Sequence, residues 1–173
     1  MIDFSDIHYL QTGNQRQQAA FKAIEKLGVL EHFEAYTPML VGTIPINIDI
    51  KGSDLDIICH VSDQKAFKDL LIRYLNFQEF SSKVVLIDQV PTVIANFHAE
   101  GFDFEIFGQD IPVLQQKGYR HMLIEYLILE SEDDGFRRSV VALKEQGYKT
   151  EPAFATLLAL EGDPYQAMLD YKK

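Results

Sequence analysis

The sequence of 173 residues contains a single cysteine, Cys59. One thiol excludes an internal disulfide and also excludes the paired-cysteine spacing of a zinc finger. Cys59 follows the apolar residues Ile57 and Ile58, and a small thiol in such a run is far more often a packed hydrophobic group than a nucleophile. We therefore expect a buried Cys59 that takes no part in chemistry.

Long hydrophobic runs are also missing. No window approaches about 18 uninterrupted apolar residues, the length that indicates a membrane-spanning helix. Residues 1–6 lack the basic region and the apolar core of a secretory signal peptide. These absences predict a cytoplasmic protein with no membrane partner.

Positive charge is scarce, with 16 lysines and arginines against 26 aspartates and glutamates. The formal net charge of -10 at pH 7 opposes diffuse attraction to a phosphate backbone. We therefore expect no long nucleic acid among the partners. The rest of the composition, 47% hydrophobic and 24% charged, is that of an ordinary folded protein.

Periodic apolar patterns and turn residues predict the elements along the chain. Asn14 and Gln17 form a capping-box pattern ahead of a helix that stops at Gly28, and Ser62 or Asp63 caps a second helix. The expected strands cover 37–43, 54–61, 82–88, 92–98 and 102–107, with a turn at 89–91, and the expected C-terminal helices cover about 113–130, 132–146, 151–161 and 164–171.

Two carboxylates, Asp54 and Asp56, stand one residue apart inside an apolar run. In a strand they point to the same face, while Leu55 and Ile57 point to the other. Two such charges repel each other by roughly 4 kcal/mol at about 4 Å and an effective dielectric near 20. A divalent cation reverses that sign, so the pattern indicates a metal site.

A glycine and a hydroxyl residue, Gly42-Thr43, end the strand that precedes the carboxylates. The pattern of an apolar residue, Gly, a Ser-like residue, a spacer and then two alternating acids resembles the signature of the nucleotidyltransferase superfamily, which includes DNA polymerase beta, aminoglycoside nucleotidyltransferases and bacterial minimal nucleotidyltransferases. Gly52-Ser53 and the later segment 104–108 are most similar to an uncharacterised bacterial domain-of-unknown-function family within that superfamily.

This resemblance implies an α+β fold with a mixed sheet, helices on one side and a C-terminal helical extension. We expect a nucleotidyltransferase-like core at 1–111 and the extension at 112–173, packed together as one unit. The resemblance further implies a magnesium cofactor of two ions, held by Asp54, Asp56 and a third carboxylate. Glu105 is our choice for that third ligand and for the catalytic base, and Asp103 is the second choice. The alternative is that both acids form the polar outer face of an edge strand.

The nucleotide phosphates need partners of the opposite sign. The resemblance implies that Gly42 and Thr43 position a nucleoside triphosphate, with Ser53 and Lys51 nearby. The isoleucines of 44–51 alternate with polar residues or proline, which predicts an extended connection, although Pro45 can also open a short helical turn.

Arg120 is expected to lean over the acids as a phosphate clamp, with His121 as a secondary donor. The alternative for this segment is a solvated helix face on which His121 pairs with Glu125.

The activity that follows from the resemblance is transfer of a nucleoside monophosphate from a nucleoside triphosphate to a hydroxyl of a small molecule or a protein. Two other interpretations stay open. One is a non-catalytic binding module of the same fold, for example a toxin or antitoxin partner. The other is a nucleotide hydrolase or pyrophosphotransferase that uses the same acids.

Overall fold

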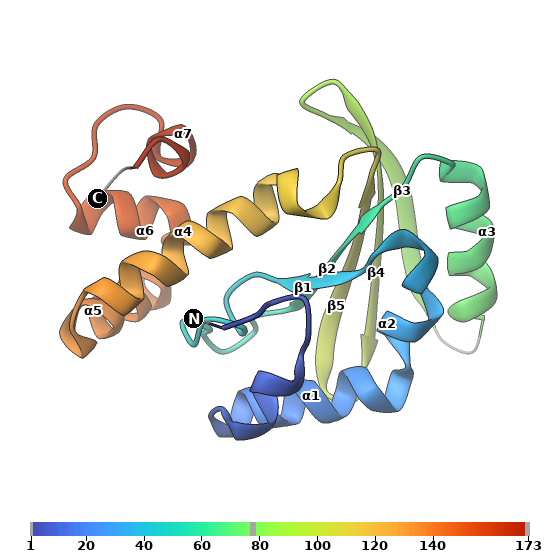
Figure 1. Cartoon of the computed structure of the whole chain (residues 1–173), viewed down its shortest axis with the longest axis horizontal. Coiled ribbons are helices and arrows are strands. Elements are labelled where there is room, and N and C mark those ends of the chain that lie inside the picture. Colours follow the sequence, from blue (N-terminus) through green and yellow to red (C-terminus); the bar gives the residue numbers. More distant parts are fainter. Residues whose placement is uncertain (1, 77–78, 172–173) are drawn as a thin grey trace.

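A mixed sheet in the strand order β1-β2-β5-β4-β3 forms the centre of the fold (Figure 1). The computed structural model describes residues 2–76 and 79–171. Outside the described residues lie residues 1, 77, 78, 172 and 173, which include the first residue of the predicted unit 1–111 and the last two residues of the predicted unit 112–173. Strands β2 and β5 are parallel, and the other neighbours are antiparallel. The strands are β1 Met39–Val41, β2 Leu55–His60, β3 Phe80–Ile87, β4 Val90–Ala99 and β5 Phe102–Gln109.

The β3–β4 hairpin turns earlier than predicted, at Asp88 and Gln89. Both residues have positive φ, 50° and 65°, and a two-residue turn of this kind matches the twist of the strands that it joins. Pro91, predicted in the turn, lies inside β4 opposite Leu86.

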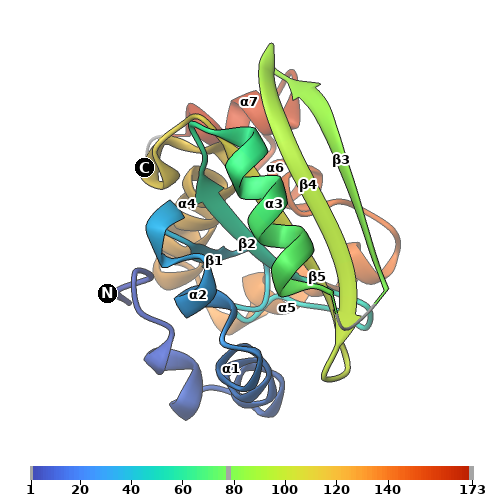
Figure 2. The same ribbon diagram turned by 90° about the vertical axis from the view of Figure 1, so that its right-hand side faces the viewer.

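Helices from the first half of the chain cover one face of the sheet, and Figure 2 shows α3 in front of the strands. Helix α1 begins with the predicted capping box of Asn14 and Gln17 and ends at Gly28, and α3 is capped by Asp63. The buried core on this face includes Leu55 and Ile57 of β2. These elements are η1 His8–Thr12, α1 Gln15–Leu27, α2 Val29–His32, η2 Glu34–Tyr36 and α3 Gln64–Tyr74.

The C-terminal helices pack on the opposite side, at the left of Figure 1. They share a second buried core with Met39 and Val41 of β1 and with Ile58 of β2. These elements are η3 Val113–Gln115, α4 Lys117–Ser131, α5 Asp134–Glu145, α6 Thr150–Leu157 and α7 Pro164–Leu169. The α+β class with a helical extension is therefore confirmed, while the boundary at residue 112 stays a prediction. Within 2–76 and 79–171, no helix has the length and apolar character to cross a membrane.

The connection at 44–51 is not extended as predicted but forms turns. Asn47 has φ 58°, and the amide of Ile48 donates to the carbonyl of Thr43 at 3.1 Å. The isoleucines at 44, 46 and 48 are buried all the same, because the turns direct them into the two cores on either side. Side chains from α1 and α5 bind the carbonyl groups that a strand partner would otherwise bind.

Candidate functional site

Three adjacent strands bring the predicted acids into one cavity of about 610 Å³. Val41 pairs with Asp56, and Asp56 pairs with Glu105 across the parallel β2–β5 contact. Asp54 stands immediately before β2. Because side chains alternate along a strand, Asp56 faces the C-terminal helices while Leu55 and Ile57 face the other core. The structure thus places Asp54, Asp56 and Glu105 around the same space.

Asp56 sits in an environment that resists ionisation. Burial raises the pKa of its carboxyl to about 7. The carboxylates of Asp54 and Glu105 act in the same direction, and the Lys144 ammonium opposes them. Burial is also the largest cause that raises the pKa of Glu105, followed by the charge of Asp54. This is the environment in which a bound cation strongly favours the ionised carboxylates.

The two candidates for the third carboxylate differ in position. Glu105 lines the cavity beside Asp56. Asp103 is exposed, and its Oδ1 lies 2.8 Å from Nδ1 of His98. The structure therefore brings Glu105 to the acids, and it leaves Asp103 on the outer surface.

Gly42 is packed against Asp56. Its φ of 88° favours glycine, and a methyl group at this position would overlap the Asp56 carboxylate. Thr43, Lys51 and Ser53 line the same cavity. The Ser53 hydroxyl accepts a hydrogen bond from the Ile50 amide at 2.9 Å, which holds the loop closed.

Arg120 does not reach the acids, contrary to the expectation. It is exposed and lines a separate hollow with Lys117 and Asp88. Successive side chains of a helix point about 100° apart. His121, the next residue of α4, therefore faces the acidic cavity. The order of side chains around the helix therefore gives the cavity an imidazole and no guanidinium from this segment.

Three buried or partly buried ionisable side chains that sequence reasoning did not assign to the site also line the cavity. They are Glu125 of α4, Lys144 of α5 and Glu151 of α6. Lys144 is only 6% exposed, and its ammonium donates to the carbonyl of Ile48 at 2.7 Å. Apart from the spacing of four between His121 and Glu125, the sequence carries no signal for this group.

Lys144 interacts both with acids at the strand side of the cavity, Asp49 and Asp54, and with the helix acids Glu125 and Glu151. Burial lowers its pKa, while Glu125, Asp49, Glu151 and Asp54 raise it. Glu125 is almost fully buried, and burial raises the pKa of its carboxyl to about 8, with Glu151 acting in the same direction and Lys144 against it. The ammonium therefore stabilises negative charge on both sides of the cavity.

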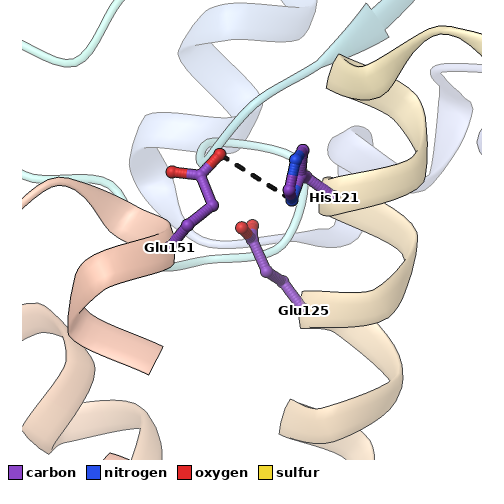
Figure 3. Close-up of side chains that lie close together, drawn as sticks. All are labelled: His121, Glu125 and Glu151. Carbon is purple, nitrogen blue, oxygen red and sulfur yellow. Dashed lines mark ion pairs between the residues drawn. The ribbon is translucent and has the colours of Figure 1, made fainter. Parts of the chain in front are cut away.

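His121, Glu125 and Glu151 form the tightest ligand group of the described chain (Figure 3). One ligand atom from each lies within 4.8 Å of the other two, and among the described residues no other three acidic, histidine or cysteine side chains are gathered in this way. The oxygens of Asp54, Asp56 and Glu105 are thus more widely spread, as expected for like charges without a cation between them.

The fold is the nucleotidyltransferase fold. The polymerase core of TRAMP, an RNA surveillance complex, matches 90% of this chain with a TM-score of 0.54 at 13% identity, over 49% of its own chain. A chain of the GLD-2/RNP-8 complex matches 88% with a TM-score of 0.54 at 17% identity, over 61% of its length. Cid1 poly(U) polymerase with MgGTP bound matches 73% with a TM-score of 0.54 at 12% identity, over 41% of its length.

The chain spans 41–61% of the length of these three proteins. At identities of 12–17%, these matches show a shared fold and nothing more, and it is the fold that the resemblance implied. Residues 22–171 match the family described as Domain of unknown function (DUF4269), and the chain belongs to that family. No curated protein matches the sequence.

The perturbed carboxyl of Asp56 predicts how stability depends on pH. The pKa of Asp56 is 3.8 in the unfolded chain and about 7 in the folded protein. Between these values the folded state binds more protons than the unfolded state. The contribution of Asp56 to the free energy of unfolding therefore falls as pH rises from about 4 to 7. With metal removed by a chelator, Asp56→Asn should flatten this decline and raise the free energy of unfolding at neutral pH by on the order of 1–3 kcal/mol. Urea unfolding over a range of pH measures the effect, with Asp103→Asn as the control.

Parallel pH profiles for wild type and Asp56→Asn would contradict the prediction.

The contact between Gly42 and Asp56 predicts an unusually costly glycine substitution. Gly42→Ala combines a left-handed φ with overlap on the carboxylate, whereas Gly101→Ala has a φ of 79° and nothing within 4 Å. Gly42→Ala should therefore cost about 1–3 kcal/mol more than Gly101→Ala in urea unfolding. The excess should disappear in an Asp56→Ala background. Equal losses at the two glycines would show that backbone strain alone is responsible.

Proposed function

We propose that this protein transfers a nucleoside monophosphate from a nucleoside triphosphate to a hydroxyl group of a small molecule or a protein. The observation that carries the proposal is the pairing of Asp56 with Glu105 in neighbouring parallel strands, with Asp54 and Gly42 at the same cavity. The nucleotidyltransferase fold supports it, and the cavity is large enough for a small-molecule ligand.

The strand acids fit magnesium by their chemistry. Carboxylate oxygens are its preferred ligands, and burial of Asp56 and Glu105 beside further negative charge is an unfavourable state that a cation relieves. Asp54, Asp56 and Glu105 would hold the ions. When bound, magnesium neutralises charge on the nucleotide phosphates and orients them.

The chain's own groups then have defined roles. Gly42 and Thr43 contribute backbone amides at the rim, where the triphosphate lies, and Lys51 adds a positive charge. Glu105 accepts the proton of the acceptor hydroxyl. The acceptor oxygen forms a bond to the α-phosphorus, the bond from that phosphorus to the bridging oxygen breaks, and pyrophosphate leaves.

Charge favours a small or protein acceptor over RNA. Five carboxylates and three lysines line the cavity, so its formal charge is −2. The carboxylates are Asp54, Asp56, Glu105, Glu125 and Glu151, and the lysines are Lys51, Lys144 and Lys149. The whole chain carries a net charge of -10. A negative surface of this kind repels a polynucleotide at a distance, even though the similar Cid1 protein is a poly(U) polymerase.

A non-catalytic binding module, such as a toxin or antitoxin partner, is the second candidate function. The observation that favours it lies at 43–53, all of which the structure describes: this segment forms turns and no helix. A triphosphate at this rim therefore has no helix N-terminus to bind it.

Nucleotide binding tests the proposal directly. A nucleoside triphosphate at about 100 times its dissociation constant should stabilise the fold by roughly 2.7 kcal/mol, a rise in Tm of about 5–10 °C. The rise should require magnesium and vanish in the Asp54→Asn, Asp56→Asn double variant, with Asp103→Asn as the control. If none of the common triphosphates gives a magnesium-dependent rise, the binding module is the better description.

The role of Glu105 predicts a separation of turnover from binding. Glu105→Gln removes the proton acceptor but keeps the shape of the side chain, so turnover should fall about 100-fold or more while nucleotide affinity changes little. Mass spectrometry of products from a metabolite pool with labelled nucleotide measures the transfer and separates it from hydrolysis. Asp103→Asn is the matched control, and a larger loss of turnover in that variant would assign the third carboxylate to Asp103.

A further inference from the structure

The wall of the cavity opposite the strand acids contains a group of side chains that nucleotide transfer as proposed does not use. His121 and Glu125 lie one turn apart on α4, and Glu151 lies in the first turn of α6 (Figure 3). His121 is 6% exposed and Glu125 is 3% exposed. Burial of an imidazole and a carboxyl side by side is costly unless each finds a partner.

His121 points to a ligand that is not part of the chain. Its Nδ1 atom is buried and has no hydrogen-bond partner among the described residues. The nearest acidic oxygen, Oε1 of Glu151, lies 3.9 Å from Nδ1, which is beyond hydrogen-bond distance. A buried ring nitrogen that has no hydrogen-bond partner beside two carboxylates is unusual, because buried polar atoms are nearly always paired.

The spacing suits a metal ion. Two ligand atoms that each lie about 2.1 Å from a common ion are at most about 4.2 Å apart. The pair of Nδ1 and Oε1 is already inside that limit at 3.9 Å. One ligand atom from each of the three residues lies within 4.8 Å of the other two, so side-chain rotations that shorten this separation by about 0.6 Å would complete a three-ligand site.

The identity of the ligands selects the class of metal. One imidazole nitrogen and two carboxylate oxygens suit zinc and neighbouring first-row divalent cations, whereas magnesium prefers oxygen ligands alone. Lys144 interacts with both glutamates, and the charges of Lys117 and Arg120 act on His121. A bound cation favours the ionised form of both carboxylates, and two carboxylate charges then outweigh the Lys144 ammonium.

We propose that His121, Glu125 and Glu151 bind a divalent transition-metal ion, separate from the magnesium site of the strand acids, that links α4 to α6 at the cavity wall. Three protein ligands leave a coordination position free for water or a ligand in the cavity. The site needs no nucleotide, so it stands or falls independently of the proposed transfer.

Zinc binding to the full chain, without nucleotide, tests the proposal. Isothermal titration of chelator-stripped protein with Zn²⁺ should give one equivalent in the wild type, and also in the Asp54→Asn, Asp56→Asn double variant. His121→Gln and Glu151→Gln should each weaken binding at least about 100-fold, since even outer-shell changes at metal sites cost 10–100-fold. Glu130→Gln, an exposed glutamate on the same helix, is the matched control. Excess Mg²⁺ should not displace the zinc.

Several outcomes would overturn the proposal. One is no stoichiometric zinc in the wild type. Another is zinc lost in the strand double variant but kept in His121→Gln, which would assign the metal to the strand acids. A third is equal weakening in Glu130→Gln, which would indicate diffuse charge binding. Circular dichroism and urea unfolding in chelator establish that each variant is folded, and Glu151→Gln, at a half-buried position, keeps the test valid if the buried His121→Gln does not fold.

Discussion

The parallel pairing of β2 with β5 is the constraint on which the rest of the site depends. It sets Asp56 directly beside Glu105 on a face that α4 and α5 cover. Burial, followed by the charge of Asp54, raises the pKa of both carboxyls, and Glu105 adds to the rise at Asp56. The surroundings accommodate this pair: residue 42 has no side chain, so the Asp56 carboxylate fits against its backbone.

The C-terminal helices complete the cavity and do more than cover the sheet. Lys144 of α5 reaches the 44–51 turns, where it is held by the Ile48 carbonyl, and its charge acts on acids of both cavity walls. The opposite wall has a different chemistry, because His121 contributes a nitrogen ligand where the strand acids contribute oxygens alone. The two walls therefore offer different ligand atoms, and the buried Lys144 ammonium interacts with acids of both.

Much of this arrangement is readable from the sequence, because it depends on local rules. The alternation at 54–57 already assigns Asp54 and Asp56 to one face and Leu55 and Ile57 to the other, and the capping box at Asn14 begins α1 as expected. The acid between aromatic residues in 102–107 indicated a third carboxylate, but the alternation cannot choose between Asp103 and Glu105, which share a face. The register with β2 separates them in space, since Glu105, and not Asp103, lies opposite Asp56.

The sequence by itself determined the fold class and the placement of the strand acids on one face beside a glycine, since side-chain period, caps and motif spacing act over a few residues. Only the tertiary structure decided which helix residues line the cavity. Arg120 and His121 are neighbours in sequence, yet the packing of α4 on β1 turns the imidazole inward and leaves the guanidinium outside. Lys144 and Glu151 reach the cavity because α5 packs on α4 and α6 packs on α5. Contacts between residues so far apart in the chain depend on packing, which no local pattern encodes.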